Sequence, residues 1–216
     1  MTNEEILKLC DHSVLSPTAG FDEIEKNCAL AIKYNCATFC IAPCHVAAVK
    51  KLCGNKLKIC TVIGFPNGYN DTATKAFEAS HMIDCGADEI DVVINLAWAC
   101  AENYEAVENE LKQLRRATDG KILKVIVEAC RLPEHVLRKL CPIVSSVGAD
   151  FIKTSTGFGE YGAREQDVRL MRELCAPKTK IKAAGGINSF EDAQKMIDAG
   201  ADRIGTSRLV KLMLEY

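Results

Sequence analysis

Short apolar segments alternate with longer amphipathic segments along the whole chain. The short segments have the composition of β-strands, and eight of them start about 22 to 34 residues apart. That spacing fits one strand plus a crossover helix, which indicates parallel strands. The predicted strands are residues 11–15, 36–42, 59–65, 88–95, 122–128, 149–155, 180–184 and 202–207.

Several of the connecting segments carry apolar side chains at helical spacing. They predict helices over Thr72–Cys85, Tyr104–Leu114 and Phe190–Ala199. The last of these begins after Ser189, a residue type that caps helices, and two acidic residues follow, which suits the helix dipole. Strands and helices are therefore expected to alternate, as in an α/β protein.

A short pattern, G-A-D-x-I, occurs three times, at residues 86–90, 148–152 and 200–204. In each copy a helical segment ends at the glycine, which can adopt the left-handed conformation, and a strand begins. Eight such units closing on themselves form a (β/α)8 TIM barrel, here of near-minimal length and as a single domain over residues 1–216. An open doubly wound sheet is the alternative, but it normally has fewer parallel strands, and no G-x-G-x-x-G follows the first strand.

The composition is that of a globular protein, with 48% apolar and 26% charged residues. Twenty-seven basic and 29 acidic residues give a net charge of -2, which disfavours a nucleic-acid or anionic-membrane surface. No apolar run approaches the ~18 residues of a membrane span, and the N-terminus lacks the plan of a signal peptide. We expect a cytoplasmic protein that binds neither nucleic acid nor membrane.

Twelve cysteines are scattered along the chain, mostly in apolar segments, and none forms a C-x-x-C pair. The closest grouping is Cys36, Cys40 and Cys44, followed by His45. Because a free cysteine usually behaves as a small buried hydrophobe, we expect reduced thiols and no metal site.

The G-A-D-x-I pattern also sets a strand register. The residues that follow it are Asp91, Lys153 and Gly205, which should lie at equal depth on three strands with Asp91 and Lys153 facing the barrel interior. The seventh strand adds Lys182 on its inward face. Asp91 and one lysine could form a structural ion pair, but a second lysine without an obvious partner would be costly to bury without a function.

Paired lysines suggest a chemistry. A neighbouring ammonium and partial desolvation can lower a lysine pKa from about 10.4 to about 7–8. This shift corresponds to a destabilisation of the ammonium form, relative to the amine, by about 4 kcal/mol. The neutral amine then attacks a carbonyl and forms a Schiff base, which serves as an electron sink. A carboxylate and the second lysine could carry protons through water.

Glycine-containing loops follow three of the last strands. Gly157 ends the segment after Lys153, Gly185 and Gly186 follow the seventh strand, and Gly205 to Ser207 end the eighth. Barrel enzymes often bind phosphate with the loops after strands seven and eight, so these residues predict a phosphorylated substrate.

Five motifs together resemble the deoxyribose-phosphate aldolase family. They are DHSVLSP (11–17), VIGFPNG (62–68), ADEIDVVIN (87–95), KTSTGF (153–158) and KAAGGI (182–187), and they span essentially the whole chain in order. The resemblance implies a class I aldolase that cleaves 2-deoxy-D-ribose 5-phosphate to glyceraldehyde 3-phosphate and acetaldehyde without a metal or other cofactor. It further implies that Lys153 forms the Schiff base and that Asp91 and Lys182 relay protons.

The chain departs from the family pattern at three positions. Ser16 stands where the family commonly has lysine, Asn188 where it usually has arginine or a similar group, and Arg208 where small residues often follow Ser207. None of these is one of the three proposed catalytic residues. Arg208 either supplies positive charge for a phosphate or is simply solvated.

Further candidates have weaker support. Asp11, with His12, either borders the site or caps a local turn, and Cys40 aligns with a cysteine near the family's pocket but is expected in the core. Lys124 and Glu128 share a face of the fifth predicted strand and are expected to form an interior ion pair.

Two other functions remain open. One is a different Schiff-base sugar-phosphate aldolase or a transaldolase-like barrel, and the other is a barrel that binds phosphate without catalysis. The partner expected in each case is a small sugar phosphate, and a homodimer is left open.

Overall fold

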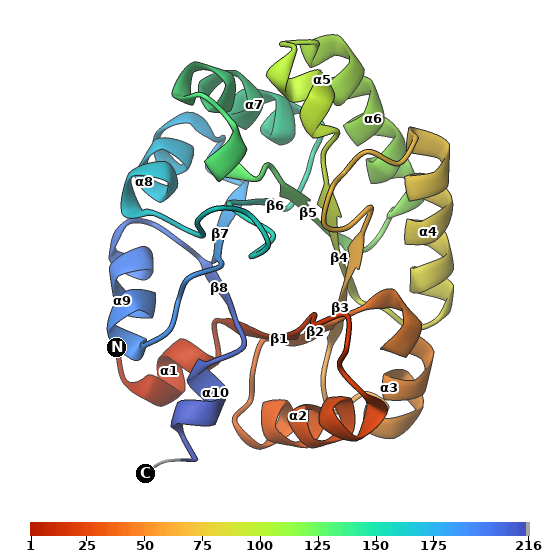
Figure 1. Ribbon diagram of the computed structural model, residues 1–216, viewed down its shortest axis with the longest axis vertical. Helices are drawn as coiled ribbons and strands as arrows, with labels where there is room; N and C mark the ends of the chain where they lie inside the picture. Colours follow the sequence, from red (N-terminus) through yellow and green to blue (C-terminus); the bar gives the residue numbers. More distant parts are fainter. Residues whose placement is uncertain (215–216) are drawn as a thin grey trace.

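The computed structural model describes residues 1–214 and contains a closed barrel of eight parallel strands that pair in chain order. Figure 1 looks down the barrel, with the strands in the central ring and the helices around it. The predicted TIM barrel is therefore confirmed. Within the described residues, none of the helices combines the length and apolarity that a membrane crossing requires.

The strands begin and end within three residues of the predicted limits. They are β1 (Cys10–Val14), β2 (Thr38–Ile41), β3 (Ile59–Ile63), β4 (Glu89–Val93), β5 (Ile122–Ile126), β6 (Phe151–Lys153), β7 (Lys180–Ala184) and β8 (Arg203–Thr206). Six of the eight predicted strands were longer than the observed ones, because they included residues of the helix–strand joints or of the loops that follow.

Helices separate the strands, and the three that were predicted are confirmed. The helices are α1 (Asn3–Leu7), α2 (Phe21–Lys33), α3 (Val46–Cys53), α4 (Thr72–Asp84), α5 (Leu96–Cys100), α6 (Tyr104–Ala117), α7 (Glu134–Ser146), α8 (Glu165–Leu174), α9 (Phe190–Asp198) and α10 (Leu209–Leu212). Two 3-10 turns, η1 (Pro43–His45) and η2 (Ala129–Arg131), follow β2 and β5.

The G-A-D-x-I pattern is a structural joint, and its aspartate explains why the pattern recurs. The three glycines have φ values of 110°, 76° and 113° just after α4, α7 and α9. Each following aspartate then accepts a backbone N–H at or near the start of the preceding strand. These hydrogen bonds run from Ile59 to Asp88 (2.9 Å), from Leu123 to Asp150 (2.8 Å) and from Ile181 to Asp202 (2.8 Å).

The isoleucines of the same pattern fill the space between the barrel and the helices. Ile90, Ile152 and Ile204 are fully buried in the main apolar core. Because side chains alternate along a strand, this orientation turns the next residue of each strand into the barrel.

Inside the barrel, the strand pairing arranges the inward side chains in layers of four taken from alternate strands, as is usual for this fold. From the N-terminal end of the strands, the bottom layer is Thr38, Glu89, Phe151 and Arg203. The middle layer is Asp11, Cys60, Lys124 and Lys182. The upper layer is Cys40, Asp91, Lys153 and Gly205, so the three pattern-related residues do lie at equal depth.

The start of α9 provides a test of local stability. The Ser189 hydroxyl accepts the Asp192 N–H at 3.0 Å, and Asp192 accepts the Ser189 N–H at 3.1 Å. Ser189→Ala removes one half of this capping box and should lower the free energy of unfolding by about 1 kcal/mol in urea titrations. Ser146→Ala, at the exposed end of α7, is the matched control and should change it by less than about 0.5 kcal/mol. Equal changes would show that the cap contributes nothing specific.

Candidate active site

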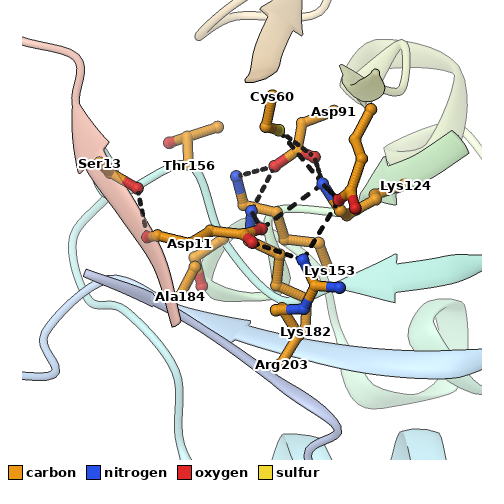
Figure 2. Close-up of polar contacts among 12 residues, drawn as sticks. Asp11, Ser13, Cys60, Asp91, Lys124, Lys153, Thr156, Lys182, Ala184 and Arg203 are labelled. Carbon is orange, nitrogen blue, oxygen red and sulfur yellow. Dashed lines mark hydrogen bonds and ion pairs between the residues drawn. The ribbon is translucent and has the colours of Figure 1, made fainter. Parts of the chain in front are cut away.

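The carboxylate of Asp91, on β4, lies at the centre of the barrel's polar cluster (Figure 2). Its Oδ2 accepts hydrogen bonds from Lys153 Nζ at 2.8 Å and Lys182 Nζ at 2.7 Å. Its Oδ1 accepts from Lys124 Nζ at 2.7 Å and from the Cys60 thiol at 3.1 Å. Three lysines from three successive strands, β5 to β7, therefore meet at one carboxylate.

A second set of ion pairs lies below this carboxylate. Asp11 Oδ2 is 2.5 Å from Lys182 Nζ, and Asp11 Oδ1 accepts from Arg203 at 2.5 Å. Glu89 pairs with Lys124 at 2.7 Å and with Arg203 at 3.2 Å. Asp11 is thus an interior ion-pairing group on β1, and its interpretation as a local cap was wrong.

These contacts correct the prediction that Lys182 has no obvious partner. Burial acts to lower the pKa of Lys182, but Asp11 and Asp91 together raise it above its usual value. The same balance raises the pKa of Lys124 well above its usual range. Both side chains are therefore favoured as ammonium groups in this structure, and Lys182 pairs with two carboxylates.

The carboxyl groups shift in the opposite direction. Burial alone would raise the pKa of Asp91, but Lys124, Lys153 and Lys182 hold it well below its usual value. Asp11 behaves in the same way, with Lys124, Lys182 and Arg203 as the compensating charges. The interior thus contains ionised carboxylates in contact with permanent cations.

Lys153 differs from the other two lysines in its access to solvent. It is 2% exposed, whereas Lys124 and Lys182 are fully buried, and it lines a pocket of about 490 Å³ at the C-terminal end of the barrel. The predicted phosphate residues line the same pocket: Gly157, Gly185, Gly186, Gly205 and Ser207. The structure therefore joins the glycine loops and the reactive amine in one cavity.

Close backbone contact holds two of these loops together. Gly185 has φ of 81°, and a Cβ built on it would lie 3.0 Å from the Cα of Gly162 and 3.3 Å from that of Gly157. Only glycine suits this position, because a side chain would push the two loops apart. The need for glycine here is conformational as well as steric.

Glu128 secures the loop after β6 from the other side. Its carboxylate accepts hydrogen bonds from the hydroxyl and the backbone N–H of Thr156. The predicted ion pair between Glu128 and Lys124 was wrong. Glu128 lies beyond the end of β5 with a φ of 49°, so the alternation of the strand no longer applies to it, and Lys124 pairs with Asp91 and Glu89 instead.

The three departures from the family pattern also lie at this pocket. Ser16, Asn188 and Arg208 line it, as does Lys211, which the sequence did not single out. Arg208 and Lys211 are exposed side chains on either side of the start of α10. Two cations therefore stand at the mouth of the pocket.

Cys40 lies in the upper layer and is fully buried, next to Cys60. Each of the twelve cysteines is unpaired in the structure. Among residues 1–214, the potential metal-ligating side chains that come together in a group of three are Cys40, Cys60 and Asp91. A cation there would have to displace lysine ammonium groups from Asp91.

Fold and site together define a barrel enzyme whose reactive groups are lysines around one carboxylate. The model of the DeoC/LacD family aldolases matches residues 6–209. A deoxyribose-phosphate aldolase of Clostridioides difficile (strain 630) is 45% identical over 210 residues, covering 97% of this chain and 96% of the relative. One from Streptococcus agalactiae (serotype Ia) is 48% identical over 213 residues, covering 99% and 96%.

Solved structures agree with this result. An aldolase called QR15 superposes with a TM-score of 0.93 at 39% identity, covering 98% of this chain and 96% of that one. The deoxyribose phosphate aldolase of Aeropyrum pernix, described as a unique tetramer, gives 0.91 at 32% identity, covering 99% and 92%. The chain belongs to the DeoC/LacD family of aldolases.

The ion pairs of Asp11 predict a pH-dependent contribution to stability. At pH 3 the folded protein keeps Asp11 ionised, whereas the unfolded chain protonates it, because the reference pKa is about 3.9. Stability from this group is thus complete above about pH 4 and is lost as pH falls. Asp11→Asn should reduce the slope of unfolding free energy against pH, near pH 3, by about 1.4 kcal/mol per unit.

Urea titrations between pH 2.5 and 6 measure this slope. Asp119→Asn removes an exposed carboxylate that is outside the ion pairs of the described residues, and it should leave the slope as in the parent. An unchanged slope in Asp11→Asn would mean that Asp11 is not held ionised by its neighbours.

Proposed function

We propose that this chain cleaves 2-deoxy-D-ribose 5-phosphate reversibly to D-glyceraldehyde 3-phosphate and acetaldehyde, through a Schiff base on Lys153. The observation that carries the proposal is that Lys153, of the three lysines around Asp91, is the one that lines the pocket. Relatives that are 45–48% identical over nearly their whole length bear the name of this activity.

Charge balance supports Lys153 as the nucleophile. The interior holds the carboxylates of Asp11, Glu89 and Asp91, and these match the charges of Lys124, Lys182 and Arg203. Among the described residues, Lys153 has no acidic partner of its own, because it shares Asp91 with Lys124 and Lys182. Lys182 differs from the sequence prediction, because it already pairs with two carboxylates, those of Asp11 and Asp91.

Asp91 and Lys182 are proposed as the proton relay. Asp91 Oδ2 contacts both Lys153 and Lys182, so one oxygen can exchange protons with the reacting amine and with the second lysine. Lys153 adds to the aldehyde carbon of the open-chain sugar, and loss of water gives the protonated imine. A base then removes the proton of the C3 hydroxyl, and the C2–C3 bond electrons move into the imine to form an enamine.

The remaining steps complete the turnover. Glyceraldehyde 3-phosphate leaves with C3 to C5 of the sugar, and the enamine takes up a proton at C2. Water then hydrolyses the acetaldehyde imine, which releases acetaldehyde and restores the Lys153 amine. Imine formation releases one water and imine hydrolysis consumes one, so the net reaction is carbon–carbon bond cleavage without hydrolysis. Each step in this scheme uses protein side chains, substrate and water.

The phosphate is proposed to bind at the pocket mouth, among Gly157, Gly185, Gly186, Gly205 and Ser207. Arg208 and Lys211 line the same pocket, and their charges compensate for the uncharged Ser16 and Asn188. This assigns Arg208 a binding role rather than that of a solvated side chain.

The rest of the proposal concerns the whole molecule. We propose one catalytic domain over residues 1–216 that acts in the cytoplasm, a reducing compartment that keeps cysteine thiols free. A homodimer is also proposed, in line with the tetramer named for the relative from Aeropyrum pernix.

Loss of the Lys153 amine tests the nucleophile. Lys153→Met should reduce acetaldehyde release from deoxyribose 5-phosphate by a factor on the order of 10⁴ or more, because the imine pathway is closed. Borohydride with acetaldehyde should label the parent at Lys153 and leave the variant unlabelled, as read by peptide mass spectrometry. Lys195→Met, at an exposed position of α9, is the control and should keep both activities. Full labelling of the Lys153 variant at Lys182 would reassign the nucleophile.

Arg208 tests the phosphate site. Arg208→Gln should raise KM for deoxyribose 5-phosphate by about 10- to 150-fold, since a charge-assisted hydrogen bond contributes about 1.5–3 kcal/mol, with little change in kcat. The kcat/KM for unphosphorylated 2-deoxyribose should stay within about twofold of the parent. Lys178→Gln, just before the opposite end of β7, removes an equal charge and should affect neither substrate. Equal losses on both substrates would mean that Arg208 does not bind the phosphate.

A further inference from the structure

Two thiols face each other inside the catalytic barrel. Cys40 on β2 and Cys60 on β3 are direct partners in the strand register and are both fully buried. Their sulfur atoms and a carboxylate oxygen of Asp91 all lie within 4.8 Å of one another. Neighbouring strands are about 4.7–4.9 Å apart, within the Cα separation of about 4.4–6.8 Å that disulfides span.

The charges around the pair favour a reactive thiolate. The neighbouring Cys60 thiol lowers the pKa of Cys40 to about 7, against the effect of burial, and Lys182 and Lys153 add to the shift. Burial and the Cys40 and Asp91 neighbours raise the pKa of Cys60 well above its usual value. The pair is therefore asymmetric, with Cys40 as the thiolate and Cys60 as the thiol.

The pair lies directly beneath the substrate pocket. Cys40, Cys60 and Val62 form a small apolar cluster of their own, separate from the main core, and the half-buried side chains of Leu15 and Phe65 cover it. Leu15 also lines the pocket. The cluster and the pocket thus share Leu15, so the pocket is the route by which we expect a small neutral molecule to approach the thiols.

We propose that Cys40 and Cys60 are a reversible oxidation site, at which a small peroxide forms a disulfide that switches the enzyme off. The Cys40 thiolate attacks one oxygen of hydrogen peroxide, the O–O bond breaks, and Cys40 sulfenic acid and hydroxide result. The Cys60 sulfur then displaces the sulfenic hydroxyl as its thiol proton is transferred, and water leaves. Two thiols and one peroxide thus yield one disulfide and two waters, and a dithiol reductant reverses the reaction.

The disulfide would act through Asp91. Cys60 donates to Asp91 Oδ1 at 3.1 Å and accepts from Lys124 Nζ at 3.1 Å. Oxidation removes the thiol proton and draws Cys60 sulfur towards Cys40, so both contacts are lost. Asp91 then shifts from the position between Lys153 and Lys182 that the relay requires, and turnover falls.

Other neighbouring thiols in the fold supply controls. Cys10 lies against Cys36, Cys28 against Cys53, and Cys141 against Cys175. These pairs lie outside the inward layers of the barrel, and the last joins α7 to the end of α8. A measurement of total free thiols would not distinguish these pairs from Cys40 and Cys60, so each crosslinked peptide must be identified individually.

The experiment uses the full chain, reduced, freed of reductant and kept in a chelator, which prevents metal ions from contributing. A modest excess of hydrogen peroxide is added, samples are blocked by alkylation at intervals, and peptide mass spectrometry measures the Cys40–Cys60 crosslink beside the rate of acetaldehyde release. Activity should fall at least tenfold, in proportion to the crosslink, and dithiothreitol should restore it.

Variants are compared with their own reduced forms. Cys40→Ala should be inactivated at least tenfold more slowly than the parent, and Cys40→Ser serves if the alanine variant does not fold. Cys60→Ala should form no crosslink at Cys40. Cys175→Ala removes an outer pair and should be inactivated like the parent.

Inactivation of the parent without the crosslink, a crosslinked enzyme that stays active, or equal sensitivity of the Cys40 variants would each overturn the proposal. The activity readout rests on the proposed function. A reduced parent that never cleaves deoxyribose 5-phosphate would overturn that function, whereas the crosslink measurement would still decide whether this pair is an oxidation site.

Discussion

The carboxylate of Asp91 sets the arrangement of the whole interior. Three lysine ammonium or amine groups from β5, β6 and β7 meet at its two oxygens within a space that excludes water. An unpaired charge in such a place would be costly, so every further cation needs a further anion. Asp11 and Glu89 meet this need for Lys182, Lys124 and Arg203, and the layers that would otherwise hold bulky aliphatic side chains are largely polar.

Stability therefore comes mainly from outside the barrel. The apolar core lies between strands and helices, where Ile90, Ile152 and Ile204 are fully buried. The aspartates of the same pattern tie neighbouring strands together at their N-terminal ends, far from the pocket. This division allows the C-terminal end of the barrel to hold glycine loops and closely spaced charges, since the opposite end and the outer shell supply the rigidity.

The local sequence was enough to predict part of this arrangement. The G-A-D-x-I joint determines which residues of β4, β6 and β8 face the barrel interior, and so it places Asp91, Lys153 and Gly205 at the same depth. It failed where a contact depends on the barrel closing. Asp11 and Lys182 meet only because β1 pairs with β8 and β7 lies beside it, which no local pattern reveals. Extending alternation from Lys124 to Glu128 failed because β5 ends at Ile126 and the chain then turns. The pairing of β4 with β5 places Lys124 directly beside Asp91, and this contact needs the register between the two strands as well as the alternation within each.

The bottom layer of the barrel also determines the route by which molecules reach Lys153. Phe151, with Arg203 stacked 5.2 Å from its ring centre, and the buried Thr38 and Glu89 fill the N-terminal end of the chamber. Substrates, products and water therefore reach Lys153 through the pocket mouth, where the phosphate is proposed to bind. In the cleavage direction the phosphorylated fragment therefore leaves by the route through which hydrolytic water enters. In the synthetic direction both aldehydes have to enter by this same mouth, so on the proposed phosphate site acetaldehyde has to pass the position at which the phosphate binds.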